Sequence, residues 1–98
     1  MSEPVLAPAD VDAALAEQGI DWVRQDDELT TTVTLRDFAG ALAFVNEVGA
    51  AAEAANHHPD IDIRWNKVRL VLTTHDAGGL TVLDLALATA IDRLRPLR

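Results

Sequence analysis

The sequence predicts an α+β fold, in which three helices pack on one face of a four-stranded antiparallel sheet in the order α-β-β-α-β-β-α. Two observations lead to this prediction. Segments whose apolar residues recur at helical spacing alternate with pairs of short runs rich in β-branched residues. The two runs of each pair are separated by only a few polar residues, which is typical of hairpins and therefore of an antiparallel sheet.

A chain of 98 residues is long enough for one domain with a buried core but too short for two. Its apolar content of 49% and charged content of 24% are those of an ordinary globular domain. The first eight residues include two prolines and the start of the chain shows no periodicity, so we expect a flexible N-terminal arm over residues 1–7. Residues 8–98 are then expected to form the single domain.

The first helix is predicted over residues 8–18. Pro8 suits the first turn of a helix, where a backbone N–H is not needed. Val11 and Leu15 recur at helical spacing, which indicates one buried face. Gly19 fits the left-handed position that often follows a helix, so we expect the helix to end just before it.

The first hairpin is predicted from residues 22–25 and 29–35, which flank the acidic turn of residues 26–28. Alternation along the second run indicates that one face of the sheet is covered and that the other, rich in threonine, is wetter. The residues expected on the covered face are Leu29, Thr31, Val33 and Leu35.

The longest helix is predicted over residues 37–56, because the hydrophobic period there changes from two to about 3.6. Pro59 cannot continue a helix and restricts the residue before it, so the helix is expected to end near His57. Its C-terminus would therefore present His57 and His58. The apolar stripe is expected to comprise Phe38, Leu42, Val45, Val48, Ala52 and Ala55.

The second hairpin is predicted from residues 61–65 and 68–74, with Asn66 and Lys67 as its turn. After a glycine-containing loop, Thr81 and Asp84 have the spacing of a capping box, which predicts a helix start. The last helix is expected to end near residues 95–96. Its buried side is expected to comprise Leu83, Leu87, Ala90, Ile91 and Leu94.

The charge and composition exclude several functions. The formal charge is −8, from 16 acidic and 8 basic residues, whereas nucleic-acid binding rewards clustered lysine and arginine. The chain contains no cysteine, so disulfides, thiolate metal sites and a cysteine nucleophile are excluded. Neither a signal peptide nor a membrane-spanning stretch is evident. We therefore expect a cytoplasmic protein without nucleic-acid or membrane partners.

All three histidines of the chain lie within residues 53–84. Glu53 precedes His57 by four residues, so on a helix the two side chains would share a face and could form a hydrogen bond. His75 is expected in a loop after the last strand, where a reactive side chain is held and accessible. Imidazoles exchange protons near neutral pH, so His57, His58 and His75 together predict a general acid-base site.

Other interpretations of these residues are available. The histidine pair could be a surface feature at a helix end, Glu53 could be an ordinary exposed carboxylate, and Asp84 is well explained as the partner of Thr81 in a capping box. Three histidines and a carboxylate could also bind zinc. Adjacent histidines seldom reach one ion, however, and the His-Glu-x-x-His spacing is absent, so a metal hydrolase is the weakest alternative.

Read as Glu53-x3-His57-His58-Pro59-x5-Trp65-x9-His75-x8-Asp84, this window resembles the signature of the pterin-4α-carbinolamine dehydratase family. The likeness extends from the first helix to about Ile91. Trp65 stands where tyrosine is frequent in the family.

The resemblance implies a hydro-lyase that dehydrates 4a-hydroxytetrahydropterin, of the 4a-hydroxytetrahydrobiopterin type, to quinonoid dihydropterin and water without metal or cofactor, thereby recycling the pterin. It further implies a homodimer or homotetramer. By resemblance the catalytic residues are His57, His58 and His75, supported by Glu53. By resemblance the pterin is contacted by His57, His58, Pro59, Thr74, His75, Asp76 and Ala77.

An alternative function on the same fold is a non-catalytic interaction module, such as a dimerisation cofactor or an assembly chaperone. Such a role would tolerate loss of the histidines, whereas the signature is complete here. Some family members are partners of transcription factors, but the acidic surface expected of this chain does not support that role.

Overall fold

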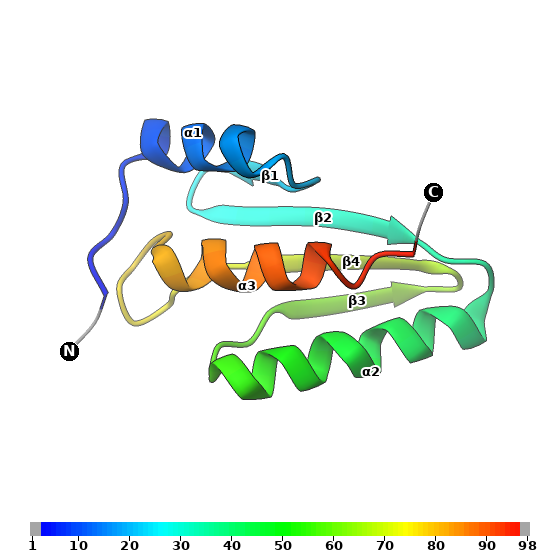
Figure 1. Cartoon of the computed structure of the whole chain (residues 1–98). Coiled ribbons are helices and arrows are strands. Elements are labelled where there is room, and N and C mark those ends of the chain that lie inside the picture. Colours follow the sequence, from blue (N-terminus) through cyan, green and yellow to red (C-terminus); the bar gives the residue numbers. More distant parts are fainter. Residues whose placement is uncertain (1–2, 97–98) are drawn as a thin grey trace.

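The computed structural model describes residues 3–96 and shows the predicted α+β fold (Figure 1). The elements are α1 (Pro8–Gln18), β1 (Val23–Gln25), β2 (Glu28–Thr34), α2 (Phe38–Ala55), β3 (Asp60–Arg64), β4 (Lys67–Leu72) and α3 (Val82–Asp92). The predicted order is confirmed, as are the bounds of the first helix, after which Gly19 takes the left-handed conformation (φ 61°).

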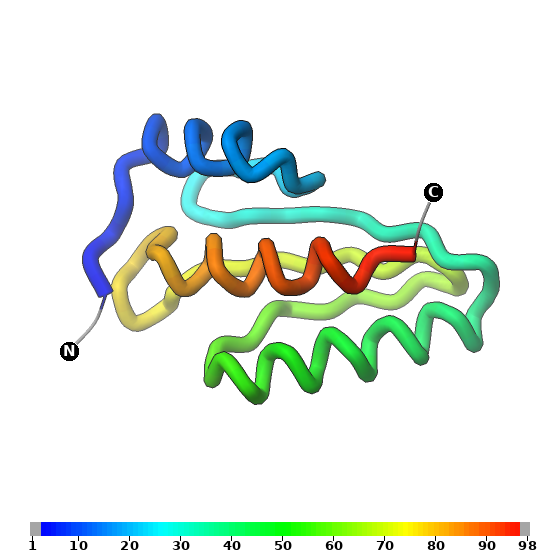
Figure 2. The backbone as a smooth tube through the Cα atoms, in the orientation of Figure 1, coloured from blue at the N-terminus to red at the C-terminus, as the bar shows by residue number. Residues whose placement is uncertain are grey.

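The sheet has the strand order β1-β2-β4-β3, and all neighbouring strands are antiparallel. Three pairs on β2 and β4 (Leu29 with Leu72, Thr31 with Leu70, Val33 with Val68) lie on the face that the helices cover. The three helices all lie on this side, and α3 runs between α1 and α2 (Figures 1 and 2). The core therefore lies in a single layer between helices and sheet.

The turn of the second hairpin is shifted by one residue from the prediction. Arg64 pairs with Lys67, so the turn consists of Trp65 and Asn66 rather than Asn66 and Lys67. Asn66 fixes this register through two hydrogen bonds to Leu35. The Asn66 side-chain amide donates to the Leu35 backbone carbonyl (3.0 Å), and the Asn66 backbone carbonyl accepts from the Leu35 backbone amide (2.7 Å). Trp65 is left in the left-handed conformation (φ 53°) and is 68% exposed.

The predicted stripe on α2 was wrong in part. Val48 and Ala52 are buried as expected, but Phe38 and Leu42 are 49% and 42% exposed. The remaining buried residues of the helix are Ala41 and Phe44. The helix is alanine-rich and nearly apolar all round, so hydrophobic periodicity alone could not identify the buried side.

Helix α3 begins with the predicted capping box. The Thr81 side chain accepts from a backbone amide in the first turn of the helix, and the Asp84 side chain accepts from the Thr81 backbone amide. The helix ends at Asp92, three residues earlier than expected. The prediction was right that Leu87 and Ile91 are buried. It missed Leu85 and Ala88.

One end of the sheet brings together the segments that carry the histidines. Asp60 pairs with Val71, so the chain entering β3 lies beside the chain leaving β4. The C-terminus of α2 precedes β3, and the loop after β4 leads into α3. In Figure 1 these segments meet at the end of the sheet opposite the β3–β4 turn.

Candidate active site

His57, His58 and His75 line one cavity, with a volume of about 390 Å³. They arrive from two different segments of the chain, the exit of α2 and the loop after β4. The other residues that line this cavity are Asn56, Thr73, Thr74, Asp76 and Leu83. The structure therefore brings the three predicted imidazoles to a single hollow.

The end of α2 determines how the histidine pair is presented. Asn56 adopts the left-handed conformation (φ 50°) that commonly terminates a helix. The His57 amide then donates back to the Ala52 carbonyl (3.1 Å), which holds the chain against the last helical turn. Pro59 follows and directs the chain into β3. The histidines are thus fixed by local backbone geometry, although they lie outside the helix.

The carboxylate that contacts His57 belongs to Asp84. His57 Nε2 lies 2.6 Å from Asp84 Oδ1, and Asp84 is fully buried. Asp84 Oδ2 accepts from the Thr74 hydroxyl (2.7 Å) and from the Thr81 backbone amide (2.9 Å). Because three polar partners surround its two oxygens, this buried carboxylate is a rigid support for the imidazole. The predicted contact between Glu53 and His57 was therefore wrong.

Glu53 instead contacts His58, through Glu53 Oε2 and His58 Nε2. The side chains of Glu53 and His58 are 79% and 55% exposed, respectively. Exposed ion pairs of this kind contribute only about 0–1 kcal/mol, because water screens them. Glu53 is therefore a much weaker support for its histidine than the buried Asp84 is for His57.

His75 lies in the loop of residues 73–80, which we call the His75 loop. Thr74 and Gly79 bridge its two ends through hydrogen bonds of 3.2 and 3.4 Å. Within residues 3–96, the His75 ring has no hydrogen-bond partner, and the residue is exposed. Its nitrogens are therefore available to a ligand.

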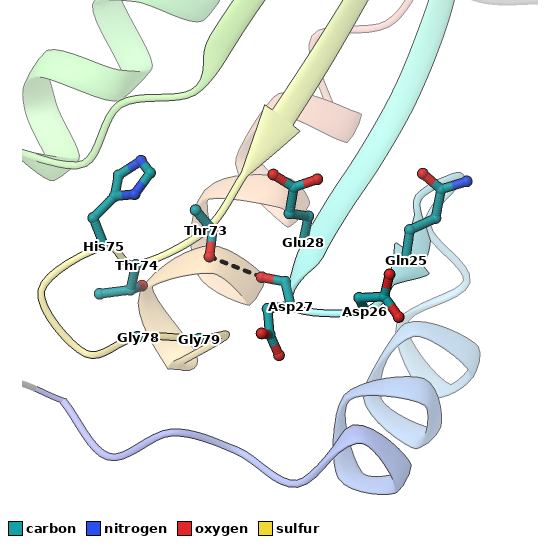
Figure 3. A pocket seen from close by; sticks show the side chains of 9 residues that line it. All are labelled: Gln25, Asp26, Asp27, Glu28, Thr73, Thr74, His75, Gly78 and Gly79. Carbon is teal, nitrogen blue, oxygen red and sulfur yellow. Dashed lines mark hydrogen bonds between the residues drawn. The ribbon is translucent and has the colours of Figure 1, made fainter.

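A second hollow, of about 520 Å³, lies on the other side of the His75 loop (Figure 3). It shares Thr73, Thr74 and His75 with the first cavity. Its other wall is the β1–β2 turn, which the Thr73 hydroxyl holds by donating to the Asp27 carbonyl (2.8 Å). The imidazole of His75 thus stands at the boundary between the two hollows.

The remaining predicted site residues are distributed as follows. Thr74 and Asp76 line the cavity of the three histidines, whereas Pro59 and Ala77 are not among its lining residues. Sequence reasoning missed Asn56, Thr73 and Leu83. Asn56 and Thr73 flank predicted residues, but no chemical signal marked them. Asp84 was recognised only as a capping residue, although it occupies the last position of the signature.

Trp65 belongs to the signature but not to the cavity. It sits in the β3–β4 turn, at the opposite end of the sheet from the His75 loop (Figure 1).

Metal binding and membrane insertion both depend on features that residues 3–96 would have to carry. No group of three or more histidine, aspartate or glutamate side chains in this part of the chain is arranged to hold a metal ion. No helix in the same range is both long and apolar enough to cross a membrane.

The fold is similar to that of two solved structures. A transcriptional coactivator/pterin dehydratase from Brucella melitensis superposes with a TM-score of 0.84 at 26% identity, covering 94% of this chain and 99% of that one. A pterin dehydratase-like protein, identified as a RuBisCO assembly factor in the alpha-carboxysome, superposes with a TM-score of 0.63 at 20% identity, covering 81% and 92%. The chain therefore belongs to the class of pterin-dehydratase-like folds.

Sequence relatives define the family. A protein from Chloroflexus aurantiacus (strain J-10-fl), provisionally named pterin-4-alpha-carbinolamine dehydratase, is 54% identical over 93% of this chain and 97% of its own length. One of the same provisional name from Thermosynechococcus vestitus is 48% identical over 91% and 93%. The sequence profile of the pterin 4 alpha carbinolamine dehydratase family matches residues 4–94, so the chain belongs to that family.

Proposed function

We propose that this protein is a hydro-lyase that converts 4a-hydroxytetrahydropterin, of the 4a-hydroxytetrahydrobiopterin type, to quinonoid dihydropterin and water, thereby recycling the pterin. The observation that carries the proposal is the single cavity lined by three imidazoles, one of which is held by a buried carboxylate. Membership of the dehydratase family supports the same reaction class.

The reaction needs two proton transfers at neighbouring atoms. The C4a–O bond breaks as the departing oxygen takes a proton and leaves as water. The N5–H proton is removed, and its electron pair forms the C4a=N5 double bond. One acid and one base placed near the ring can do both, and each such group contributes about 10²–10⁴-fold to a rate.

We propose that His57 is the base. Because Asp84 can only accept at Oδ1, the hydrogen-bond network assigns the His57 proton to Nε2. That tautomer leaves Nδ1 with a lone pair, which can take the N5 proton. Asp84 then stabilises the imidazolium that forms, in the manner of a carboxylate behind a catalytic histidine. Asp84 is a positioning residue in this scheme, since it acts through His57.

We propose that His75 is the acid and that His58 holds the substrate. His75 approaches the cavity from the other segment and has no competing partner among residues 3–96, so its ring can donate to the leaving oxygen. His58, whose Nε2 contacts the exposed Glu53, is better suited to binding than to proton transfer. Thr74 and Asp76 line the same cavity and are proposed to contact the pterin. Pro59 and Ala77 are proposed to shape its edge through the backbone.

The test is the dehydration of 4a-hydroxytetrahydropterin by the purified protein, followed by the change in ultraviolet absorbance. We expect His57→Gln and His75→Ala each to lower kcat by about 100-fold or more. Lys67→Ala, at the far end of the sheet, is the control and should match the wild type. A wild-type rate equal to the uncatalysed one would reject the enzyme. Co-purification with a protein partner, unchanged by His57→Gln, would then favour the interaction module.

We also propose that the protein forms a homo-oligomer. Phe38 and Leu42 lie one turn apart on α2 and are 49% and 42% exposed. Exposed apolar patches of this kind mark association surfaces. Light scattering should give two or four times the mass of one chain, and the monomer mass at micromolar concentration would contradict the proposal.

A further inference from the structure

Residues 4–7, which we call the N-terminal strap, run alongside the His75 loop (Figures 1 and 3). The Leu6 amide donates to the Leu80 carbonyl at 2.8 Å. The Leu6 side chain is half-buried and packs against the core. The strap is therefore attached to the loop by its backbone and to the domain by a side chain.

The contact is closest at Gly79, where Val5 lies directly against the backbone. A Cβ atom placed on Gly79 would stand 2.9 Å from Val5 Cγ1 and 3.6 Å from Cγ2. The first distance is shorter than a van der Waals contact allows, so only glycine permits this approach. Val5 is branched at Cβ and stiff at χ1, so relieving the close contact would take a change of its rotamer or a shift of the strap.

The contact at Gly79 also supports the part of the loop that carries His75. Gly79 is buried and is bridged to Thr74, whose hydroxyl donates to Asp84 and whose next neighbour is His75. The tip of the loop is held by its own turn, in which the Ala77 and Gly78 amides donate to the Thr74 carbonyl (3.1 and 3.0 Å), but His75, Asp76 and Gly78 are all exposed. Exposed loop tips open easily, so the position of the tip depends on the contacts at the base of the loop, of which the contact between Val5 and Gly79 is one.

The strap is stiff before it docks. Pro4 precedes Val5, and Pro8 follows Ala7, whose backbone is held in the extended region (φ −66°, ψ 143°). Proline fixes its own φ and restricts the residue before it, so this segment loses less conformational entropy on ordering than an unconstrained arm would.

We propose that the N-terminal strap is a positioning element, which holds the His75 loop so that the His75 imidazole stays in the cavity with His57 and His58. The catalytic part of this inference rests on the proposed function. The structural part, that the strap holds the loop, does not.

A pair of substitutions in the full chain tests the inference. Gly79→Ala places a methyl group where Val5 now lies and should displace the strap. Gly79 does not have a positive φ, so alanine there brings no left-handed backbone strain. Adding Val5→Ala removes the clashing methyl group together with its neighbour and leaves the new Cβ 3.9 Å from the Cβ of residue 5, an ordinary contact. Val23→Ala, on β1, is the matched control, because Val23 is 57% exposed and Val5 is 52% exposed.

The readouts are the hydrogen-exchange rates of the Leu6 and Gly79 amides and the separate values of kcat and KM. We expect Gly79→Ala to speed exchange at both amides about tenfold and to lower kcat about tenfold with little change in KM, because a displacement of about 1 Å can cost up to about 100-fold in rate. The double variant should return both readouts to within about threefold of the wild type, and Val23→Ala should change neither.

The proposal is overturned if Gly79→Ala exchanges and turns over like the wild type, or if the double variant is no better than Gly79→Ala. Should Gly79→Ala fail to fold, Val5→Ala alone must speed Leu6 exchange, and wild-type exchange there would overturn the proposal. If the wild type shows no dehydration, the proposed function fails, yet the exchange rates still decide whether the strap holds the loop.

Discussion

Asp84→Asn isolates the support that the buried carboxylate gives to His57. The substitution keeps the shape of the side chain. The asparagine oxygen can stay on the side of Thr74 and Thr81, where it accepts the same two hydrogen bonds. The amide NH₂ then faces His57 Nε2, so this nitrogen must become an acceptor and the proton must move to Nδ1. In the proposed mechanism the base is lost, although its position is unchanged.

The size of the effect follows from these contacts. Loss of the correct tautomer should lower kcat about 100-fold, which corresponds to about 2.7 kcal/mol of transition-state stabilisation. Three hydrogen bonds to a charged group become neutral ones, and the buried charge is removed at the same time. The free energy of unfolding should therefore fall by about 1–3 kcal/mol, which leaves most of the protein folded.

The assay is kcat for dehydration beside urea unfolding of the same sample. Asp92→Asn is the control, because Asp92 is on the same helix and accepts from Arg95 but lies about two turns from Asp84. It should lower stability and leave kcat within about twofold. The reasoning is refuted if Asp84→Asn also keeps kcat within about twofold while the protein remains folded.

Three further predictions concern residues around the site and in the scaffold. Glu53→Gln should lower kcat less than about threefold and leave stability within about 0.5 kcal/mol, because its contact with His58 is exposed; a 100-fold loss of kcat would contradict this. Arg95→Ala should lower the free energy of unfolding by about 2–3 kcal/mol in urea titrations, because the Arg95 side chain is only 9% exposed and its guanidinium joins the end of α3 to β2. Arg93→Ala is the control, and because Arg93 is exposed it should change the free energy of unfolding by less than about 0.5 kcal/mol. Trp65→Asn should raise the melting temperature slightly, because asparagine tolerates the left-handed backbone better, and should leave kcat unchanged; a loss of activity would show that the far turn matters to catalysis.

The fold could be predicted because its signals are local. Pro8 and Gly19 mark the ends of the first helix, and Thr81 and Asp84 mark the start of the last. The buried face of α2 could not be predicted, because a helix that is apolar on every side has no readable stripe. The turn at Trp65 was misplaced because Asn66 is fixed by hydrogen bonds to Leu35, which is 31 residues away in the chain.

The site shows the same division between local and distant information. The presence of three histidines in one window predicted that they would share a hollow, and they do. The expected contact between Glu53 and His57 assumed a continuous helix. Asn56 turns the backbone into the left-handed region first, so His58 is the residue that returns to Glu53. The contact of His57 with a residue 27 positions later in the chain could not be read from spacing.

The central claim is that three imidazoles surround one pterin, and histidine ring resonances test it most directly. The chain contains only three histidines, so each ring gives its own NMR signal when histidine is ¹³C-labelled. Titration with 7,8-dihydrobiopterin, a stable relative of the product, should shift the signals of His57, His58 and His75 with a single dissociation constant. Shifts confined to His57 and His58, with the His75 signal unmoved at saturation, would contradict the account.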